Sequence, residues 1–313
     1  MNDVNVTSRS VTMSPEARRF LRETPNPPSR AVTLEEVLKI RTEARVDPVD
    51  AVKNSTLLSM DAIDGVGVET WKAVSNSETV ARDDAAILYF YGGGYVMGGP
   101  FEDIPIFAPL AAQCGVPVIA PNYRLAPEAP FPAALDDAIT AYRWTIDQFG
   151  AENIVVVGES AGGNLATVCL LRARGEGLEM PKALALLSPW ANLTETNDSR
   201  TTHAGLDPTF PIDLSLNNES QVYAGGHDRT DALISPVFNT DWSGFPPTLI
   251  TTGTRDLLIS DCAELSTAMR RGGVDVRLHV WEGMWHVFEY YPDIPEGAES
   301  LEDISEFLSR HLR

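Results

Sequence analysis

Gly158-Glu159-Ser160-Ala161-Gly162 is the stretch that decides the fold of this 313-residue chain. The run 153–157 before it is short, apolar and rich in β-branched residues, which predicts a buried strand. The run 163–172 after it has the pattern of a helix packed on a sheet. A strand, a Gly-x-Ser-x-Gly turn and a helix are the setting of a nucleophile elbow, in which a sharp turn presents the serine hydroxyl above the sheet edge. The alternative is a glycine-rich turn without chemistry, and the rest of the chain decides between the two.

The composition is that of an ordinary globular protein, with 43% hydrophobic and 22% charged residues, and its length suits one large α/β domain or two small ones. The net charge of −20 disfavours nucleic acid and anionic membrane as partners. Residues 1–14 lack the apolar core of a signal peptide, and no stretch approaches a membrane span. The odd number of cysteines, three, suits free thiols in a reducing compartment. We therefore expect a cytoplasmic protein.

Strand and helix patterns alternate along most of the chain. Two antiparallel edge strands are expected within 56–75, and buried strands at 85–90, 116–120, 183–188, 248–252 and 274–281. Helical patterns cover 133–149, about 262–271 and about 299–311. Alternation of this kind predicts an α/β fold with a mostly parallel central sheet and helices on both faces.

Two segments fall outside this alternation. Residues 1–50 are polar and contain helical patterns at Pro15–Glu23 and Leu34–Val46. Residues 192–242 have no clear strand, and this stretch is too long for a simple loop. We expect both segments to form a helical cap. The α/β core is then expected in two parts, 51–191 and 243–313.

A serine hydroxyl needs a base near neutral pH, usually a histidine that a carboxylate orients. Loops at the carboxyl ends of parallel strands converge, so the partners of Ser160 should follow strands, in the order Ser, Asp or Glu, His. Of the five histidines, only His286 comes just after a predicted strand. Asp256 follows the strand 248–252 and is the expected acid. Its rival Asp261 has Glu264 three residues later, which suits a helix N-cap instead.

Gly92-Gly93-Gly94 also follows a predicted strand, and its bare backbone can bring N–H groups close to a bound carbonyl oxygen. A phosphate-binding loop is less well supported, because no Lys with Ser or Thr follows the glycines. The N–H group of Ala161, directly after the serine, would complete an oxyanion hole. This chemistry requires neither a metal nor a cofactor.

Together these runs resemble a known family, the hormone-sensitive-lipase-like esterases of the α/β-hydrolase superfamily. The matching runs lie in the family's order between residues 85 and 290: Tyr91–Gly94, 122–128, 158–166, Ser188–Trp190 and Gly283–Phe288. The resemblance implies the α/β-hydrolase fold with a helical cap. It also implies Ser160 as nucleophile, Asp256 as acid, His286 as base, and Gly92, Gly93 and Ala161 as oxyanion donors.

The activity that follows is that of a serine carboxylester hydrolase acting on small or medium esters, and lactones fit the same chemistry. A ligand-binding module that has lost catalysis is one alternative, which the presence of all three triad candidates disfavours. Amide hydrolysis or acyl transfer at the same site is the other. The resemblance also allows a homodimer through the last strand or helix, because similar esterases often dimerise.

Three positions depart from the family pattern. Tyr91 stands where the glycine loop usually opens with His, Glu159 where the elbow usually carries Asp, and Leu257 where Pro usually follows the acid. We expect the ring and hydroxyl of Tyr91 to support the glycine loop, although a packed apolar role at the end of its strand is the alternative. The sequence does not indicate a partner for Glu159.

Overall fold

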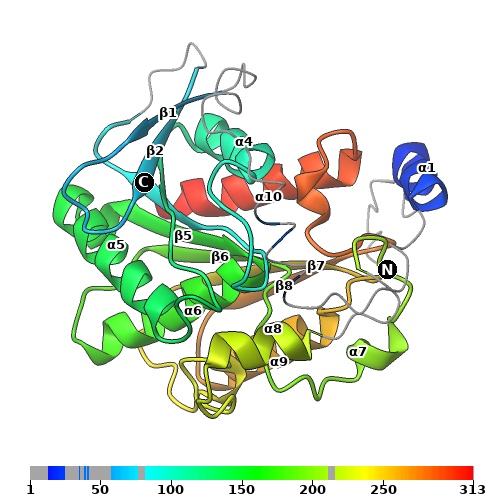
Figure 1. Cartoon of the computed structure of the whole chain (residues 1–313). Helices are drawn as coiled ribbons and strands as arrows, with labels where there is room; N and C mark the ends of the chain where they lie inside the picture. The colour runs from blue at the N-terminus through cyan, green and yellow to red at the C-terminus, as the bar shows by residue number, and fades with distance from the viewer. Residues whose placement is uncertain are drawn as a thin grey trace, which may run out of the picture.

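The computed structural model describes residues 13–24, 35, 39, 41, 58–76, 82–210 and 216–312. Its centre is an eight-stranded sheet of order β1-β2-β4-β3-β5-β6-β7-β8 (Figure 1). The strands are β1 (Leu58–Ala62), β2 (Thr70–Ser75), β3 (Ala86–Phe90), β4 (Val118–Pro121), β5 (Ile154–Glu159), β6 (Ala183–Leu187), β7 (Thr248–Gly253) and β8 (Val276–Trp281). β2 pairs antiparallel with both β1 and β4, and every other pairing is parallel. The predicted mostly parallel sheet is confirmed.

The inner strands read as continuous apolar runs because helices cover both of their faces. Every residue of β3, β4, β5, β6 and β7 is buried, whereas β8 at the sheet edge has only half-buried and exposed residues. In Figure 1, α4 (Ile104–Cys114) and α10 (Pro295–His311) lie above the sheet, and α5 (Ala133–Phe149), α6 (Ser160–Gly175) and α9 (Ile259–Arg271) lie below it. The sheet is therefore the middle of three layers.

α4 is a helix that the sequence patterns did not predict. Pro105 lies in its first turn and Pro109 lies inside it, and proline ordinarily disrupts a helix interior. The buried side chains of Ile106, Phe107 and Leu110 nevertheless anchor the helix between the sheet and α10. Tertiary packing here outweighs the local preference of the chain.

The insert between β6 and β7 contributes no strand to the sheet within its described residues. It contains α7 (Ser199–Thr202), α8 (Asn217–Ala224) and the 3₁₀ turn η2 (Pro236–Phe238). None of the helices in the described part of the chain is long and apolar enough to cross a membrane. The three cysteines are free thiols, of which Cys169 and Cys262 are buried.

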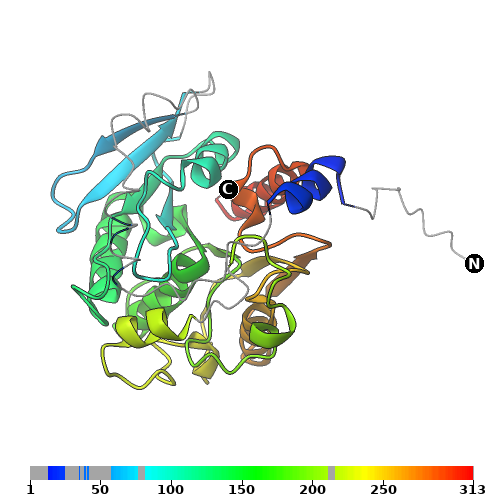
Figure 2. The same cartoon turned by 45° about the vertical axis from the view of Figure 1, so that its right-hand side comes forward.

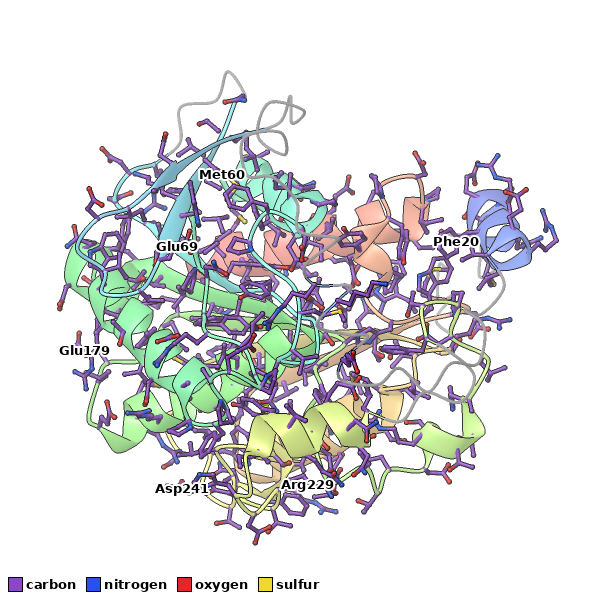
Figure 3. All side chains as sticks on the ribbon, in the orientation of Figure 1. Phe20, Met60, Glu69, Glu179, Arg229 and Asp241 are labelled. Carbon is purple, nitrogen blue, oxygen red and sulfur yellow. The ribbon has the colours of Figure 1, made fainter. Side chains whose placement is uncertain are left out.

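The N-terminal helix α1 (Pro15–Glu23) has the bounds that the sequence predicted, and Figure 2 shows it beside the orange start of α10. Its Phe20, which Figure 3 labels, stacks on Trp285 with ring centroids 4.5 Å apart. Ser14 caps the helix and donates to Glu296 of α10 at 2.8 Å from its hydroxyl. The second predicted helix, Leu34–Val46, lies outside the described residues except at positions 35, 39 and 41.

Candidate active site

Ser160 lies at the junction of β5 and α6 with φ of 51°, in the left-handed region that residues with a side chain rarely adopt. The neighbouring glycines make this turn possible. A Cβ on Gly158 would lie 2.3 Å from the carbonyl oxygen of Gly162, and one on Gly162 would lie 2.1 Å from that of Phe90. Any side chain at either position would force strand and helix apart. The pentapeptide is therefore the tight turn that its pattern predicts.

The structure brings together the three side chains that the sequence singled out. Nε2 of His286 lies 2.9 Å from Oγ of Ser160, and Nδ1 of His286 lies 3.1 Å from Oδ1 of Asp256. These residues follow β8, β5 and β7, whose parallel carboxyl ends meet at one edge of the sheet. The arrangement has the geometry of a nucleophile, a base and an orienting acid.

Asp256 is fully buried, and hydrogen bonds hold its carboxyl group in an orientation in which it can accept from His286. Its Oδ2 accepts from Oγ1 of Thr252 and its Oδ1 from the N–H of Leu258, both at 2.8 Å. Burial acts to raise the pKa of Asp256, but the charge of His286 and the hydrogen bonds from His286 and from the N–H of Leu258 lower it below its ordinary value. The side chain is therefore ionised at neutral pH and receives Nδ1–H of His286.

His286 is buried, and its surroundings act on its pKa in opposite directions. Burial lowers the pKa, but the charge of Asp256, the hydrogen bond to it and the charge of Asp207 together raise the pKa above its ordinary value. The ring of Phe210 lies 4.8 Å from the imidazole ring, centroid to centroid. The imidazole is consequently more basic than that of a free histidine, which favours proton transfer from Ser160.

Asp207 is a site residue that the sequence did not indicate. It belongs to the insert, and its Oδ2 accepts the backbone N–H of His286 at 2.9 Å. Its Oδ1 accepts the N–H of Thr209 at 2.9 Å, a local turn that the Asp-x-Thr pattern could have suggested. That pattern does not indicate the contact with His286, which lies 79 positions further along the chain. Asp207 joins the insert to the loop that carries His286.

Asp261 does not have the N-cap role that the sequence predicted. α9 begins at Ile259, two residues before it, so the carboxyl group of Asp261 lies inside the helix. It accepts the N–H of Asn192 at 2.9 Å and pairs with Arg200 at 3.2 Å. Burial raises the pKa of Asp261 to about 6, although the charge of Arg200 acts to lower it. The residue joins the start of the insert to the core.

Gly92, which the sequence offered as an oxyanion donor, lies against the carboxyl group of Glu159. Its N–H group donates to this carboxyl group, the partner that the sequence could not indicate. A Cβ on Gly92 would lie 2.0 Å from Oε1 of Glu159, so the loop passes directly against this carboxyl group. The next two residues, Gly93 and Gly94, have φ of 103° and 63°, which glycine adopts without strain.

Tyr91 is both packed and hydrogen-bonded. Its ring stacks on that of Tyr123 at 4.2 Å, and its hydroxyl group is directed at Oδ1 of Asn122 (3.2 Å) and the carbonyl oxygen of Tyr123 (3.1 Å). In return, the hydroxyl group of Tyr123 donates to the carbonyl oxygen of Tyr91 at 2.7 Å. These contacts join the loop after β3 to the loop after β4, which favours the supporting role.

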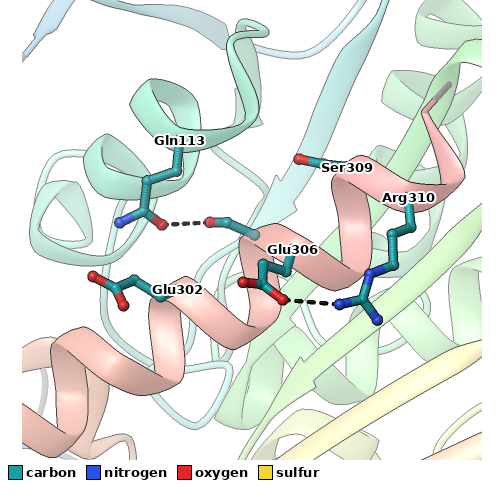
Figure 4. Close-up of a pocket in the computed structure, with 6 residues that line it drawn as sticks. Gln113, Glu302, Glu306, Ser309 and Arg310 are labelled. Carbon is teal, nitrogen blue, oxygen red and sulfur yellow. Dashed lines mark hydrogen bonds and ion pairs between the residues drawn. The ribbon is translucent and has the colours of Figure 1, made fainter.

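Two hollows in the described part of the chain have none of Ser160, Asp256 and His286 in their lining. One of about 430 Å³ lies between α4 and α10 (Figure 4) and is lined by Gln113, Glu302, Ser305, Glu306, Ser309 and Arg310. The other, of about 820 Å³, borders Asn122 and Tyr123. There Arg41 pairs with Glu128 and donates to the carbonyl oxygen of Val96 at 3.4 Å. Neither hollow combines a nucleophile with a base.

Comparison with known proteins agrees with this geometry. Residues 87–290 match a family described by the alpha/beta hydrolase fold. An acetyl-hydrolase of Streptomyces hygroscopicus is 34% identical over 229 residues, which cover 72% of this chain and 76% of the relative. An ethyl acetate hydrolase of Pseudomonas putida is 32% identical over 278 residues, 86% of this chain and 85% of the relative. The structure of EstE7, a hormone-sensitive-lipase homologue from a metagenome library, has a TM-score of 0.83 at 33% identity and covers 96% of this chain and 100% of its own.

Proposed function

The chain belongs to the hormone-sensitive-lipase-like esterases of the α/β-hydrolase fold and is a carboxylic ester hydrolase, and from this premise we propose that it cleaves small and medium esters through an acyl-enzyme on Ser160. The observation that carries the proposal is the continuous chain of contacts from Oγ of Ser160 through the imidazole of His286 to the carboxylate of Asp256.

In this mechanism Oγ of Ser160 attacks the ester carbonyl carbon while Nε2 of His286 takes the hydroxyl proton. Asp256 stabilises the imidazolium ion that forms, and the imidazolium then gives the proton to the departing alcohol. A water molecule, deprotonated by His286, attacks the acyl-enzyme. The carboxylic acid leaves, and the proton returns to Ser160.

The oxyanion of the tetrahedral intermediate is bound by backbone N–H groups. We assign them to Gly93 and Gly94 of the glycine loop and to Ala161 at the start of α6. The engagement of the Gly92 N–H with Glu159 supports this choice over Gly92. Such donors stabilise the charge that develops in the transition state, and removing one typically costs about 3–4 kcal/mol of barrier.

We assign the cap to residues 1–50 and 192–242, on the basis of the residues that the structure describes in both segments. Three contacts support this division: Phe20 stacks on Trp285, Arg41 donates to the carbonyl oxygen of Val96, and Asp207 accepts from His286. Each contact joins one of the two segments to a loop next to the site. The cap thereby limits the size of the ester that reaches Ser160.

Short acyl chains are the expected substrates, because an acetyl-hydrolase and an ethyl acetate hydrolase are among the relatives. A series of p-nitrophenyl esters of increasing acyl length should give the highest kcat/KM with acetate or butyrate. Small lactones would react by the same steps. Comparing an aryl ester with the matching anilide, with and without an added alcohol, separates ester hydrolysis from amide hydrolysis and acyl transfer.

Replacing the nucleophile tests the mechanism. Ser160→Ala should lower kcat by about 10⁴-fold or more, since removing a catalytic serine abolishes the covalent path. A fluorophosphonate probe should label the wild-type protein at Ser160 alone, as peptide mass spectrometry would show. Labelling at another residue, or an active folded Ser160→Ala variant, would contradict the mechanism.

A further inference from the structure

Two carboxyl groups lie buried against each other beside the glycine loop. Glu159 directly precedes Ser160, and Asp103 directly precedes α4; each is only 7% exposed. Their side chains form a hydrogen bond with each other. Two ionised carboxylates cannot do so, because both are acceptors only. One proton is therefore held between them.

The pair is connected at both ends to elements of the site. The hydroxyl group of Tyr89, on β3, donates to Oδ2 of Asp103 at 2.8 Å. At the other end, the carboxyl group of Glu159 accepts the N–H of Gly92, against whose Cα it lies. Glu159 thus joins the turn that carries the nucleophile to the loop that carries Gly93 and Gly94.

The groups around the pair favour retention of this proton. Burial raises the pKa of Asp103 to about 7, and burial together with the charge of Asp103 raises the pKa of Glu159 well above its ordinary value. Glu102 beside Asp103 and Glu289 in η3 (Phe288–Tyr290) add further negative charge. Two such groups titrate as a coupled pair, so the last proton leaves at a higher pH than an isolated carboxyl group would need.

The pKa values of the tyrosines near the pair are raised as well. Burial, with the neighbouring acids, raises the pKa of Tyr89 and of Tyr123, which follows β4, well above the ordinary value of about 10. The pKa of Tyr290, in η3, is raised in the same way. A change in activity at alkaline pH, but below the pH at which tyrosine titrates, therefore reports on the carboxyl pair.

We propose that the proton shared by Asp103 and Glu159 positions the glycine loop for catalysis, so that its loss to solvent at alkaline pH displaces Gly93 and Gly94 and inactivates the enzyme. With both carboxylates ionised, the two groups repel each other and Glu159 withdraws from Asp103. The N–H of Gly92 then loses its fixed acceptor. Both acids are positioning residues, and the inference rests on the proposed function through its use of these two oxyanion donors.

Isosteric amide variants separate the shared proton from the shape of the pair. In Glu159→Gln, the amide oxygen still accepts from Gly92 and the amide nitrogen donates to Asp103 at every pH. Asp103→Asn is the second variant, in which the amide donates to Glu159. Glu102→Gln is the comparison variant: it removes the half-buried neighbouring carboxyl group whose charge adds to that of the pair, so it should keep the alkaline fall in kcat and move that fall to lower pH.

The experiment measures kcat and KM on p-nitrophenyl acetate from about pH 7 to about pH 10, the range between ordinary histidine and tyrosine pKa values. The rate with Ser160→Ala is subtracted as the blank. In the wild type and in Glu102→Gln, kcat should fall at least tenfold with little change in KM, since a displacement near 1 Å can cost about 100-fold. Glu159→Gln and Asp103→Asn should keep a neutral-pH kcat within about threefold of wild type and lose this alkaline fall.

Thermal unfolding provides a second readout. A carboxyl group whose folded pKa is raised contributes stability that is lost as pH rises through that pKa. The Tm of the wild type should therefore fall more between neutral and alkaline pH than that of Glu159→Gln. An alkaline fall in kcat that persists in both amide variants, or is absent from the wild type, would overturn the inference. Activity of folded Ser160→Ala would instead overturn the proposed function.

Discussion

Tyr91 joins two loops through one ring and one hydroxyl group. The stacked pair of Tyr91 and Tyr123 is held by hydrogen bonds in both directions, so neither ring can move without disturbing the glycine loop. A histidine, which is usual in related esterases, is shorter and can titrate near neutral pH. The tyrosine provides a longer arm, and burial raises its pKa well above the ordinary value, so its donor stays in place across the working pH range.

Tyr91→Phe should therefore lower kcat by about twofold to tenfold with little change in KM. The variant keeps the ring and loses one hydrogen bond, ordinarily worth about 0.5–1.5 kcal/mol, in a loop that acts mainly in the transition state. Steady-state kinetics on a p-nitrophenyl ester measures the effect. Tyr290→Phe, at a half-exposed tyrosine, is the control and should match the wild type. An unchanged kcat in folded Tyr91→Phe would assign the residue to packing alone.

The basicity of His286 sets the acid side of the pH profile. The neutral imidazole is the active form, so activity should rise with pH through the pKa of His286, above the ordinary value of about 6.5. The charge of Asp207 is one of the causes that raise this pKa. Asp207→Asn keeps an oxygen acceptor for the N–H of His286 and removes the charge.

The midpoint of kcat/KM for Asp207→Asn should consequently move to lower pH, by about one unit at most. Profiles from pH 5 to pH 8, the window in which histidine normally titrates, would measure it. Asp231→Asn, at an exposed acid of the same insert, should leave the midpoint in place. A midpoint that stays fixed in Asp207→Asn, or rises, would show that the charge of Asp207 does not act on the base.

At the scale of elements, α1 contacts the loop of His286 through an aromatic surface. Phe20 packs face to face on Trp285 and edge to face on Tyr291, and Trp285 directly precedes His286. The helix covers these rings on one side, and its opposite face carries exposed charges such as Arg19. A helix that lies outside the sheet thus stabilises the loop that carries His286.

Phe20→Ala should lower the free energy of unfolding by about 2 kcal/mol, below the 3–5 kcal/mol typical of a fully buried Phe→Ala because Phe20 is half-buried. It should also expose Trp285, which changes the intrinsic fluorescence, and lower kcat/KM more on bulky esters than on acetates. Arg19→Ala on the exposed face is the matched control, with little effect expected. An equal loss of kcat/KM on bulky and small esters would show that α1 does not contribute to substrate selection.

At the scale of the whole molecule, the site exists because parallel strands end at one edge of the sheet. Ser160 and His286 are 126 positions apart in the chain, yet their side chains are in hydrogen-bond contact. Close backbone approach makes this possible: a Cβ on Gly253 at the end of β7 would lie 2.1 Å from the carbonyl oxygen of Met284. The loops of acid and base therefore pack directly on each other.

The sequence by itself determined the fold class, the order of the strands along the chain and the three side chains that meet at the sheet edge. It could do so because burial, strand and helix periodicity and the glycine turn are local properties that neighbouring residues encode. The family resemblance added the order of the motifs. For the same reason the bounds of α1 and α5 agree with their patterns.

Only the tertiary structure decided how distant residues pair. It formed α4 despite two prolines, placed Asp261 against the insert rather than at a helix start, and turned the N–H of Gly92 toward Glu159. It also brought Asp207 to the backbone of His286 and Asp103 to Glu159. These contacts depend on which surfaces pack together and how much water they exclude, and no stretch of sequence records either property locally.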